Sequence, residues 1–182
     1  DLAAQAGIPK GVLNVVPSND APAVGRVLCE SPLVRKLSFT GSTRVGKLLA
    51  AQCAGTVKRV SLELGGNAPV VIFEDADIEA EVTAVMAAKF RNAGQVCTTP
   101  NRILVQAAIY DRFAAALSEK VRTLKVGPGD QDGVQVGPLI SGAGVDKVER
   151  LVKAALASGA QAAAGGARHT AGSQFLTATV LT

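Results

Sequence analysis

Short apolar runs alternate with amphipathic segments along residues 1–64. The runs at 12–16, 34–39 and 57–64 are bounded by turn residues and favour strands, and the segments between them, 21–30 and 44–54, favour helices. Asp20 is a good N-cap for the first of these two helices, and Pro22 suits its first turn. The resulting β-α-β-α-β order predicts a parallel sheet with crossover helices, preceded by the end of a short helix at 1–6.

The same alternation restarts after Gly66. Strands are expected at 69–73, 102–106, 161–164 and 175–182, and helices at 78–91, 109–124 and 144–158. Two of these helices show apolar or long side chains at helical spacing: Val82, Val85, Met86, Lys89 and Phe90 in one, and Val145, Val148, Leu151, Val152 and Leu156 in the other. We place a domain boundary at Gly65, which gives domains 1–64 and 65–182.

Composition narrows the function classes. The chain has 182 residues, is 48% hydrophobic, begins without a methionine and has a mean hydropathy of +0.27, so we expect a segment of a longer protein. A net charge of +4 comes from scattered lysines and arginines, and aromatic residues make up only 3% of the chain. This argues against a nucleic-acid partner. No apolar run reaches the roughly 18 residues that a membrane span needs, so no membrane partner is expected.

The cysteines and the single histidine indicate neither a metal site nor a disulfide framework. Cys29, Cys53 and Cys97 are far apart, and His169 lies in a glycine-rich loop without an acidic neighbour, so we assign it no role. Odd, widely spaced cysteines suit a reducing compartment, and we expect a cytoplasmic protein.

Cys97 is the best candidate nucleophile. Cys29 and Cys53 fall within predicted helices among apolar neighbours, where a cysteine acts as a small hydrophobic residue. Cys97 instead follows Gly94-Gln95 in an irregular stretch, where a thiol can face a cleft and gain thiolate character.

Glu63 is a candidate general base. It stands in the apolar run Val60 to Leu64, where partial burial would raise the pKa of its carboxyl and make it a usable base. The pattern fits equally well an alternating edge strand in which Ser61 and Glu63 point outward.

The stretch Phe39 to Gly46 follows a predicted strand and opens a helix. Backbone N–H groups, a hydroxyl and glycines at a helix N-terminus can hold an anion such as a cofactor pyrophosphate. An ordinary helix start, capped by Ser42 or Thr43, explains the same residues.

Three motifs taken together resemble the aldehyde dehydrogenase superfamily. They are Phe39-Thr40-Gly41-Ser42, Leu62-Glu63-Leu64-Gly65-Gly66 and Gly94-Gln95-Val96-Cys97. The stretches Gly65 to Pro69, Lys89 to Gln95 and Asn101-Arg102 look most like those of succinate-semialdehyde dehydrogenases. The resemblance implies an α/β fold: part of a Rossmann-like nucleotide-binding sheet in 1–64, followed by part of the catalytic domain in 65–182.

The resemblance also implies a reaction. Cys97 would attack an aldehyde to give a thiohemiacetal, hydride would pass to NAD or NADP, and Glu63 would activate the water that hydrolyses the thioester. The cofactor-binding residues would be Gly41, Ser42, Gly46 and Leu64. The family's oxyanion-hole asparagine is expected outside this chain, so we expect the isolated segment to be inactive. As a separate implication of the resemblance, we expect the full-length protein to form a homodimer or homotetramer.

Arg91 and Thr99 refine this expectation. Arg91, six residues before Cys97, could clamp the distal carboxylate of succinate semialdehyde, or it could be a cation that favours a helix C-terminus. Related enzymes often carry a second cysteine where this chain has Thr99, so a disulfide switch is not expected. The resemblance also implies hydrolysis, because members of the superfamily that pass the acyl group to coenzyme A generally lack the base that Glu63 would supply. A general or betaine-type aldehyde dehydrogenase, and a non-catalytic packing or interaction module, stay as alternatives.

Overall fold

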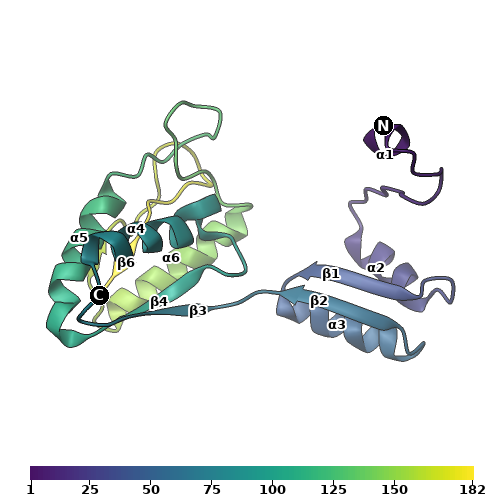
Figure 1. The fold of residues 1–182 in the computed structure, drawn as a ribbon, viewed down its shortest axis with the longest axis horizontal. Helices are drawn as coiled ribbons and strands as arrows, with labels where there is room; N and C mark the ends of the chain where they lie inside the picture. Colours follow the sequence, from purple (N-terminus) through teal and green to yellow (C-terminus); the bar gives the residue numbers. More distant parts are fainter. The chain divides into compact units, whose positions relative to one another are not determined.

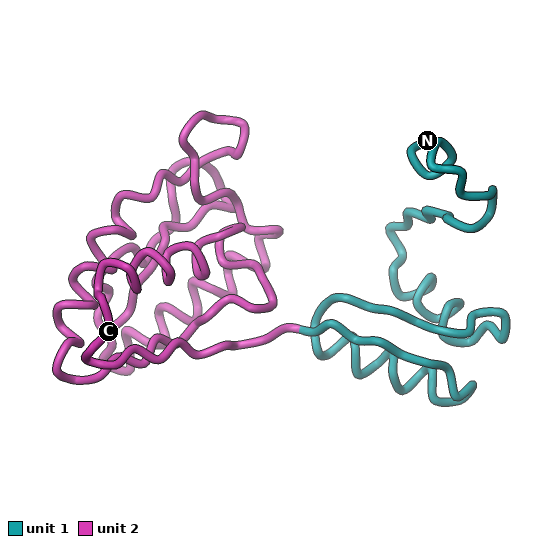
Figure 2. The backbone as a smooth tube through the Cα atoms, viewed as in Figure 1, with its two compact units in different colours: residues 1–64 teal, residues 65–182 magenta.

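A computed structural model describes residues 1–182, and the chain forms two compact units that meet between Leu64 and Gly65. Figure 2 colours unit 1, residues 1–64, and unit 2, residues 65–182. The boundary lies at the position expected from the sequence. The assignment of one unit to cofactor binding and the other to catalysis stays a prediction.

Unit 1 is built around a parallel strand pair (Figure 1). Its elements are α1 (Leu2–Gln5), α2 (Ala21–Glu30), β1 (Lys36–Gly41), α3 (Thr43–Ala54) and β2 (Arg59–Leu64). The pairing runs from Lys36 opposite Arg59 to Gly41 opposite Leu64, with α3 as the connecting helix. The small core consists of Cys29, Leu37, Leu49 and Cys53.

The strand predicted at 12–16 is absent. Val12, Leu13, Val15 and Val16 are 63–84% exposed and lie in an irregular segment. A strand needs a neighbour to accept its hydrogen bonds, and unit 1 has only the pair β1–β2. The strand predicted from Val57 is also shorter than expected, because Val57 has a φ of 49° and β2 begins two residues later.

Unit 2 combines a second parallel pair with three long helices. Its elements are β3 (Ala68–Ile72), α4 (Ile78–Phe90), η1 (Arg91–Gly94), β4 (Pro100–Val105), η2 (Ala107–Ile109), α5 (Tyr110–Arg122), α6 (Gly142–Ala157), β5 (Ala162–Ala164) and β6 (Val180–Leu181). β3 pairs with β4 in parallel, and β5 pairs with β6 in antiparallel orientation. None of the helices in either unit is long and apolar enough to cross a bilayer.

The core of unit 2 lies where α4 packs against α5, and it includes Ile72 of β3. Val82 and Val85 of α4 meet Phe113 and Leu117 of α5, and all four side chains are buried. The apolar face expected on α6 is only partly buried, since Val145 and Val152 are covered while Leu151 is 56% exposed. The closing strand expected at 175–182 is reduced to Val180–Leu181 and a single bridge between Leu176 and Arg168.

Candidate active site

The loop that carries Cys97 has an unusual backbone. Directly after α4 and Arg91, three consecutive residues adopt left-handed conformations: Asn92 with φ 52°, Ala93 with φ 54° and Gly94 with φ 77°. Asparagine and glycine tolerate this region, but it costs an alanine about 1–2 kcal/mol. Such strain concentrates at functional sites, where the surrounding contacts hold it in place. We call residues 91–97 the nucleophile loop.

Cys97 is the exposed cysteine of the chain. It lies in a turn at the end of the nucleophile loop, three residues before β4, with a free thiol. Cys29 and Cys53 are 0% and 1% exposed. Burial, together with the neighbouring Cys53, raises the pKa of the Cys29 thiol to about 11. Cys29 and Cys53 are therefore packing residues, as expected, whereas Cys97 is open to a reagent.

Gly66 lies directly against the backbone of Cys97. A Cβ atom at Gly66 would stand 2.5 Å from the carbonyl oxygen of Cys97, well inside contact distance, whereas a Cβ at Gly65 would meet nothing within 4 Å. The turn between β2 and β3 therefore supports Cys97 only because residue 66 lacks a side chain.

Gln95 fastens the nucleophile loop to a distant segment. Its Nε2 donates to the carbonyl oxygen of Pro138 at 3.3 Å, and its Oε1 accepts from the backbone N–H of Ile140 at 2.8 Å. Within the loop, Gln95 Nε2 also donates to the carbonyl of Asn92, and Asn92 Nδ2 donates to that of Gln95. The sequence places Gln95 in an irregular stretch, but its hydrogen bonds to residues 138 and 140 are long-range and have no local signal.

Lys89, in the last turn of α4, begins a chain of side-chain hydrogen bonds. Its Nζ donates to Asn101 Oδ1 at 2.5 Å, and Asn101 Nδ2 donates to Asn67 Oδ1 at 2.9 Å. Partial burial lowers the pKa of Lys89 below its ordinary value of 10.5. In the sequence, Lys89 stands out only as a member of the helical stripe that begins at Val82. A lysine within an otherwise apolar stripe is the signal that could have identified it.

Arg91 is exposed at the junction of α4 and the nucleophile loop, and it forms no ion pair. Its guanidinium is therefore available to an anionic group. Thr99, two residues beyond Cys97, is 3% exposed, and its hydroxyl has no hydrogen-bond partner.

Ser42 begins α3 in unit 1. Its Oγ accepts a hydrogen bond from the backbone N–H of Val45 at 3.3 Å, so it is the N-cap that the simpler interpretation expects. A helix leaves its first N–H groups without an intrahelical acceptor. Because Ser42 satisfies only that of Val45, the N–H groups of Thr43 and Arg44, both exposed residues, stay available to an anion.

Gly46 allows α3 to approach β2. A Cβ atom at Gly46 would lie 2.6 Å from Cδ2 of Leu64, so the contact requires glycine. A Cβ at Gly41 would meet the ring of Phe39. These contacts fix the backbone at both ends of the cofactor-binding stretch that the sequence predicts.

Glu63 lies on the exposed face of β2. Burial alternates along the strand, with Val60, Leu62 and Leu64 half-buried and Ser61 and Glu63 exposed. The outward-pointing interpretation is therefore correct for unit 1, and the partial burial expected of Glu63 is not found. β2 has β1 on one side only, and its alternation follows from having one covered face.

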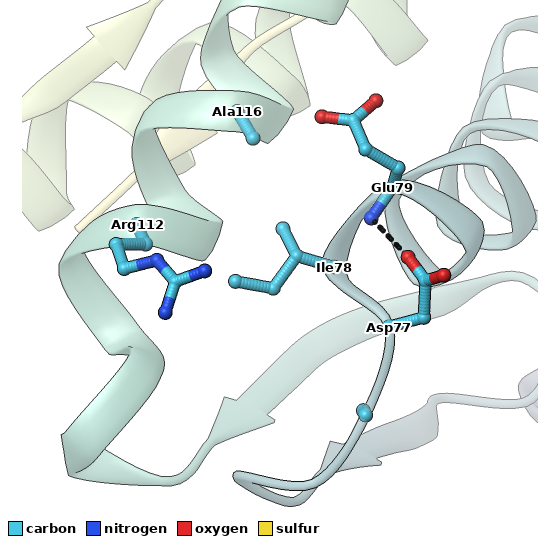
Figure 3. A pocket seen from close by; sticks show the side chains of 6 residues that line it. Asp77, Ile78, Glu79, Arg112 and Ala116 are labelled. Atoms are coloured by element: carbon cyan, nitrogen blue, oxygen red, sulfur yellow. Dashed lines mark hydrogen bonds between the residues drawn. The ribbon is translucent and has the colours of Figure 1, made fainter.

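Unit 2 contains hollows of different size. One of about 850 Å³ is lined by Asn67, Lys89, Gly94, Gln95 and Asn101 together with apolar side chains of α5, α6 and residues 176–182. Another, of about 450 Å³, lies at the start of α4 (Figure 3). There the Asp77 carboxylate accepts from the N–H of Glu79, so the helix terminus is already capped.

His169 accepts from the N–H of Ala171 through Nδ1, in a local turn. No group of three or more His, Cys, Asp or Glu side chains is arranged so that it could hold a metal ion.

The comparison with protein families decides the class of the chain. The model of the aldehyde dehydrogenase family matches residues 1–182. The chain belongs to this family. Among similar aldehyde dehydrogenases, the NADP(+) succinate-semialdehyde dehydrogenase GabD of Escherichia coli is 51% identical over 181 residues, covering all of this chain and 37% of the relative. The 3-sulfolactaldehyde dehydrogenase of Pseudomonas putida is 54% identical with the same coverage.

The fold of the chain is likewise that of an aldehyde dehydrogenase. The crystal structure of succinate-semialdehyde dehydrogenase from Burkholderia pseudomallei superposes with a TM-score of 0.96 at 52% identity, covering all of this chain and 37% of that one. The predicted family and α/β fold class are confirmed. The chain spans about a third, 34–37%, of the length of the curated relatives that it matches.

Proposed function

We propose that the full-length protein oxidises an aldehyde to a carboxylic acid with NAD or NADP. The observation that supports this most directly is Cys97: the exposed thiol of the chain, at the end of a strained loop and supported by Gly66, in a member of the aldehyde dehydrogenase family. Backbone strain of this kind clusters at active sites, which favours a reactive Cys97 over a residue of a packing module.

In the proposed reaction, the thiolate of Cys97 bonds to the aldehyde carbon, and the carbonyl oxygen becomes an oxyanion. NAD or NADP, when bound, would supply the nicotinamide that takes up a hydride from this carbon, and a thioester would then remain on Cys97. Glu63 then removes a proton from water, and the resulting hydroxide attacks the thioester and releases the acid and the Cys97 thiolate. Its exposed carboxylate on β2 is free to take this proton.

Residues of unit 1 fit a dinucleotide. The exposed N–H groups of Thr43 and Arg44 at the start of α3 suit a pyrophosphate, with Gly41 and Ser42 holding the turn. Gly46 allows α3 to pack closely against β2, and the side chain of Leu64, at the end of β2, occupies the space beside Gly46.

For the substrate, we propose an aldehyde with a distal anionic group, first of all succinate semialdehyde. Arg91 is exposed, unpaired and six residues from Cys97, and a guanidinium can bind a carboxylate through two parallel hydrogen bonds. A sulfonate offers similar acceptors, and the identity of 54% to a 3-sulfolactaldehyde dehydrogenase favours a sulfonated aldehyde as the second candidate.

The first experiment tests Cys97. In the full-length protein, iodoacetamide should label Cys97 before Cys29 and Cys53, because only Cys97 is exposed. Cys97→Ala should abolish NAD(P)H formation, while Cys53→Ala, as a matched control, should retain it. Equal labelling of the three thiols in peptide mapping, or an active Cys97→Ala variant, would support the packing module instead.

The second experiment tests Arg91. In the full-length enzyme, Arg91→Ala should lower kcat/KM for succinate semialdehyde by about 10- to 100-fold, the usual effect of losing a charge-assisted pair of hydrogen bonds. The kcat/KM for butyraldehyde should change by less than about threefold. Arg112→Ala, an exposed arginine of α5, serves as control.

Equal losses on both aldehydes would contradict the assignment of Arg91. Measuring a sulfonated aldehyde and betaine aldehyde in parallel identifies the preferred group. A preference for the cationic betaine aldehyde would exclude an arginine clamp.

A further inference from the structure

Lys89 is a charged residue in an otherwise apolar part of α4. It lies one turn beyond the buried Val85, beside Phe90, and burial of its ammonium lowers its pKa. Transfer of an ammonium from water costs free energy unless partners compensate for it. Asn101 is that partner, and Asn67 extends the hydrogen-bonded chain. The proposed reaction uses none of these three residues.

The three residues come from three segments that adjoin the nucleophile loop in sequence or through Gly66. Lys89 ends the helix that precedes the nucleophile loop, Asn101 lies in β4 directly after the loop, and Asn67 follows Gly66, which touches the carbonyl of Cys97. The loop also contacts Lys89 itself, since a Cβ at Gly94 would lie 3.2 Å from the Lys89 carbonyl oxygen and 3.7 Å from Nζ. The hydrogen bonds therefore join both ends of the loop to the turn beneath it.

We propose that Lys89, Asn101 and Asn67 form a positioning network that holds the Cys97 thiol in place for attack. The inference rests on the proposed function, since it assigns a role toward the same nucleophile. The network acts through the backbone. Its hydrogen bonds hold the segments on both sides of the three left-handed residues of the loop, and they require that the ammonium of Lys89 is half-buried. Supporting hydrogen bonds of this kind keep a reactive group within the narrow geometry that reaction requires.

Substitutions at Lys89 test the network in the full-length enzyme. Lys89→Met keeps the length of the side chain and removes the donor, so kcat should fall by about tenfold or more with little change in KM. The rate of Cys97 alkylation by iodoacetamide, followed from pH 6 to 9, should fall as well. Lys89→Arg keeps a cationic donor and should recover most of both rates. Lys147→Met, in the wall of the same hollow, is the matched control and should behave as wild type.

A double-mutant cycle separates positioning from plain stabilisation. Asn101 is exposed, so Asn101→Ala should leave the melting temperature close to that of wild type while it breaks both hydrogen bonds. If the residues act as one unit, the double variant Lys89→Met/Asn101→Ala should lose no more kcat than the worse single variant. Additive losses, or a Lys89→Met variant with wild-type kcat and alkylation rate, would overturn the network.

The alkylation readout also separates this inference from the proposed function. A protein that leaves every aldehyde unoxidised, but in which Cys97 alkylation still depends on Lys89 and Asn101, would refute the function and retain the network. An active enzyme in which Lys89→Met changes neither kcat nor the rate of Cys97 alkylation would refute the network and retain the proposed function.

Discussion

Gly66 is the residue at which the backbone around Cys97 leaves the least room. Because a methyl group there would lie 2.5 Å from the Cys97 carbonyl oxygen, Gly66→Ala must displace either the turn or the nucleophile loop. We expect kcat of the full-length enzyme to fall by about a hundredfold, the scale of effect that a misplacement of about 1 Å produces. Steady-state rates with saturating aldehyde and cofactor would measure it.

Gly65→Ala is the matched control for this substitution, since it adds the same methyl group one residue earlier, where nothing lies within 4 Å. It should retain kcat within about threefold. If the two alanine variants lose activity equally, the close contact between Gly66 and Cys97 has no catalytic importance.

For single residues, the sequence indicates the reactive side chains more clearly than the side chains that hold them in position. The neighbours of Cys97, Gly94-Gln95 and Thr98 to Pro100, distinguish it from the helical Cys29 and Cys53, and the structure confirms the difference in exposure. The bonds of Gln95 to residues 138 and 140, and of Lys89 to Asn101, join positions 12 to 45 residues apart. No local pattern encodes such pairs.

At the scale of elements, the helices follow from the sequence because their signals are local. Asp20 and Asp77 accept hydrogen bonds from the first turns of α2 and α4, as N-caps do. The structure gives α3 as Thr43–Ala54, one residue longer than predicted. The free energy of a helix start depends on residues within one turn, which a sequence displays directly.

Strands depend on neighbouring strands for their hydrogen bonds, and this explains why one predicted strand is absent and another is shorter than expected. Residues 12–16 have the composition of a strand, yet nothing in unit 1 pairs with them. The run 175–182 pairs only through Val180–Leu181 and one bridge at Leu176. β-propensity describes how well a segment fits a half-buried sheet, so a correct composition without a neighbouring strand gives no strand.

At the scale of the whole molecule, the proposed chemistry divides between the two units. Unit 2 contains Cys97, Arg91 and every contact that holds the nucleophile loop, whereas unit 1 contains Glu63 and the start of α3. In the proposed reaction, formation of the thioester would use the loop of unit 2 and the cofactor, and its hydrolysis would additionally use Glu63 of β2. The two half-reactions should respond to different substitutions.

Glu63→Gln should separate these half-reactions. Without the carboxylate, the full-length enzyme should still form a rapid burst of one NAD(P)H per Cys97, because in the proposed reaction Glu63 acts only after hydride transfer. The steady-state rate should then fall by about 10²- to 10⁴-fold, the usual contribution of a general base, and the thioester should accumulate on the Cys97 peptide, where mass spectrometry detects it. Glu74→Gln, an exposed glutamate of unit 2, is the control. A variant that loses burst and steady state in equal measure would assign Glu63 to a step before the thioester and would remove it as the hydrolytic base.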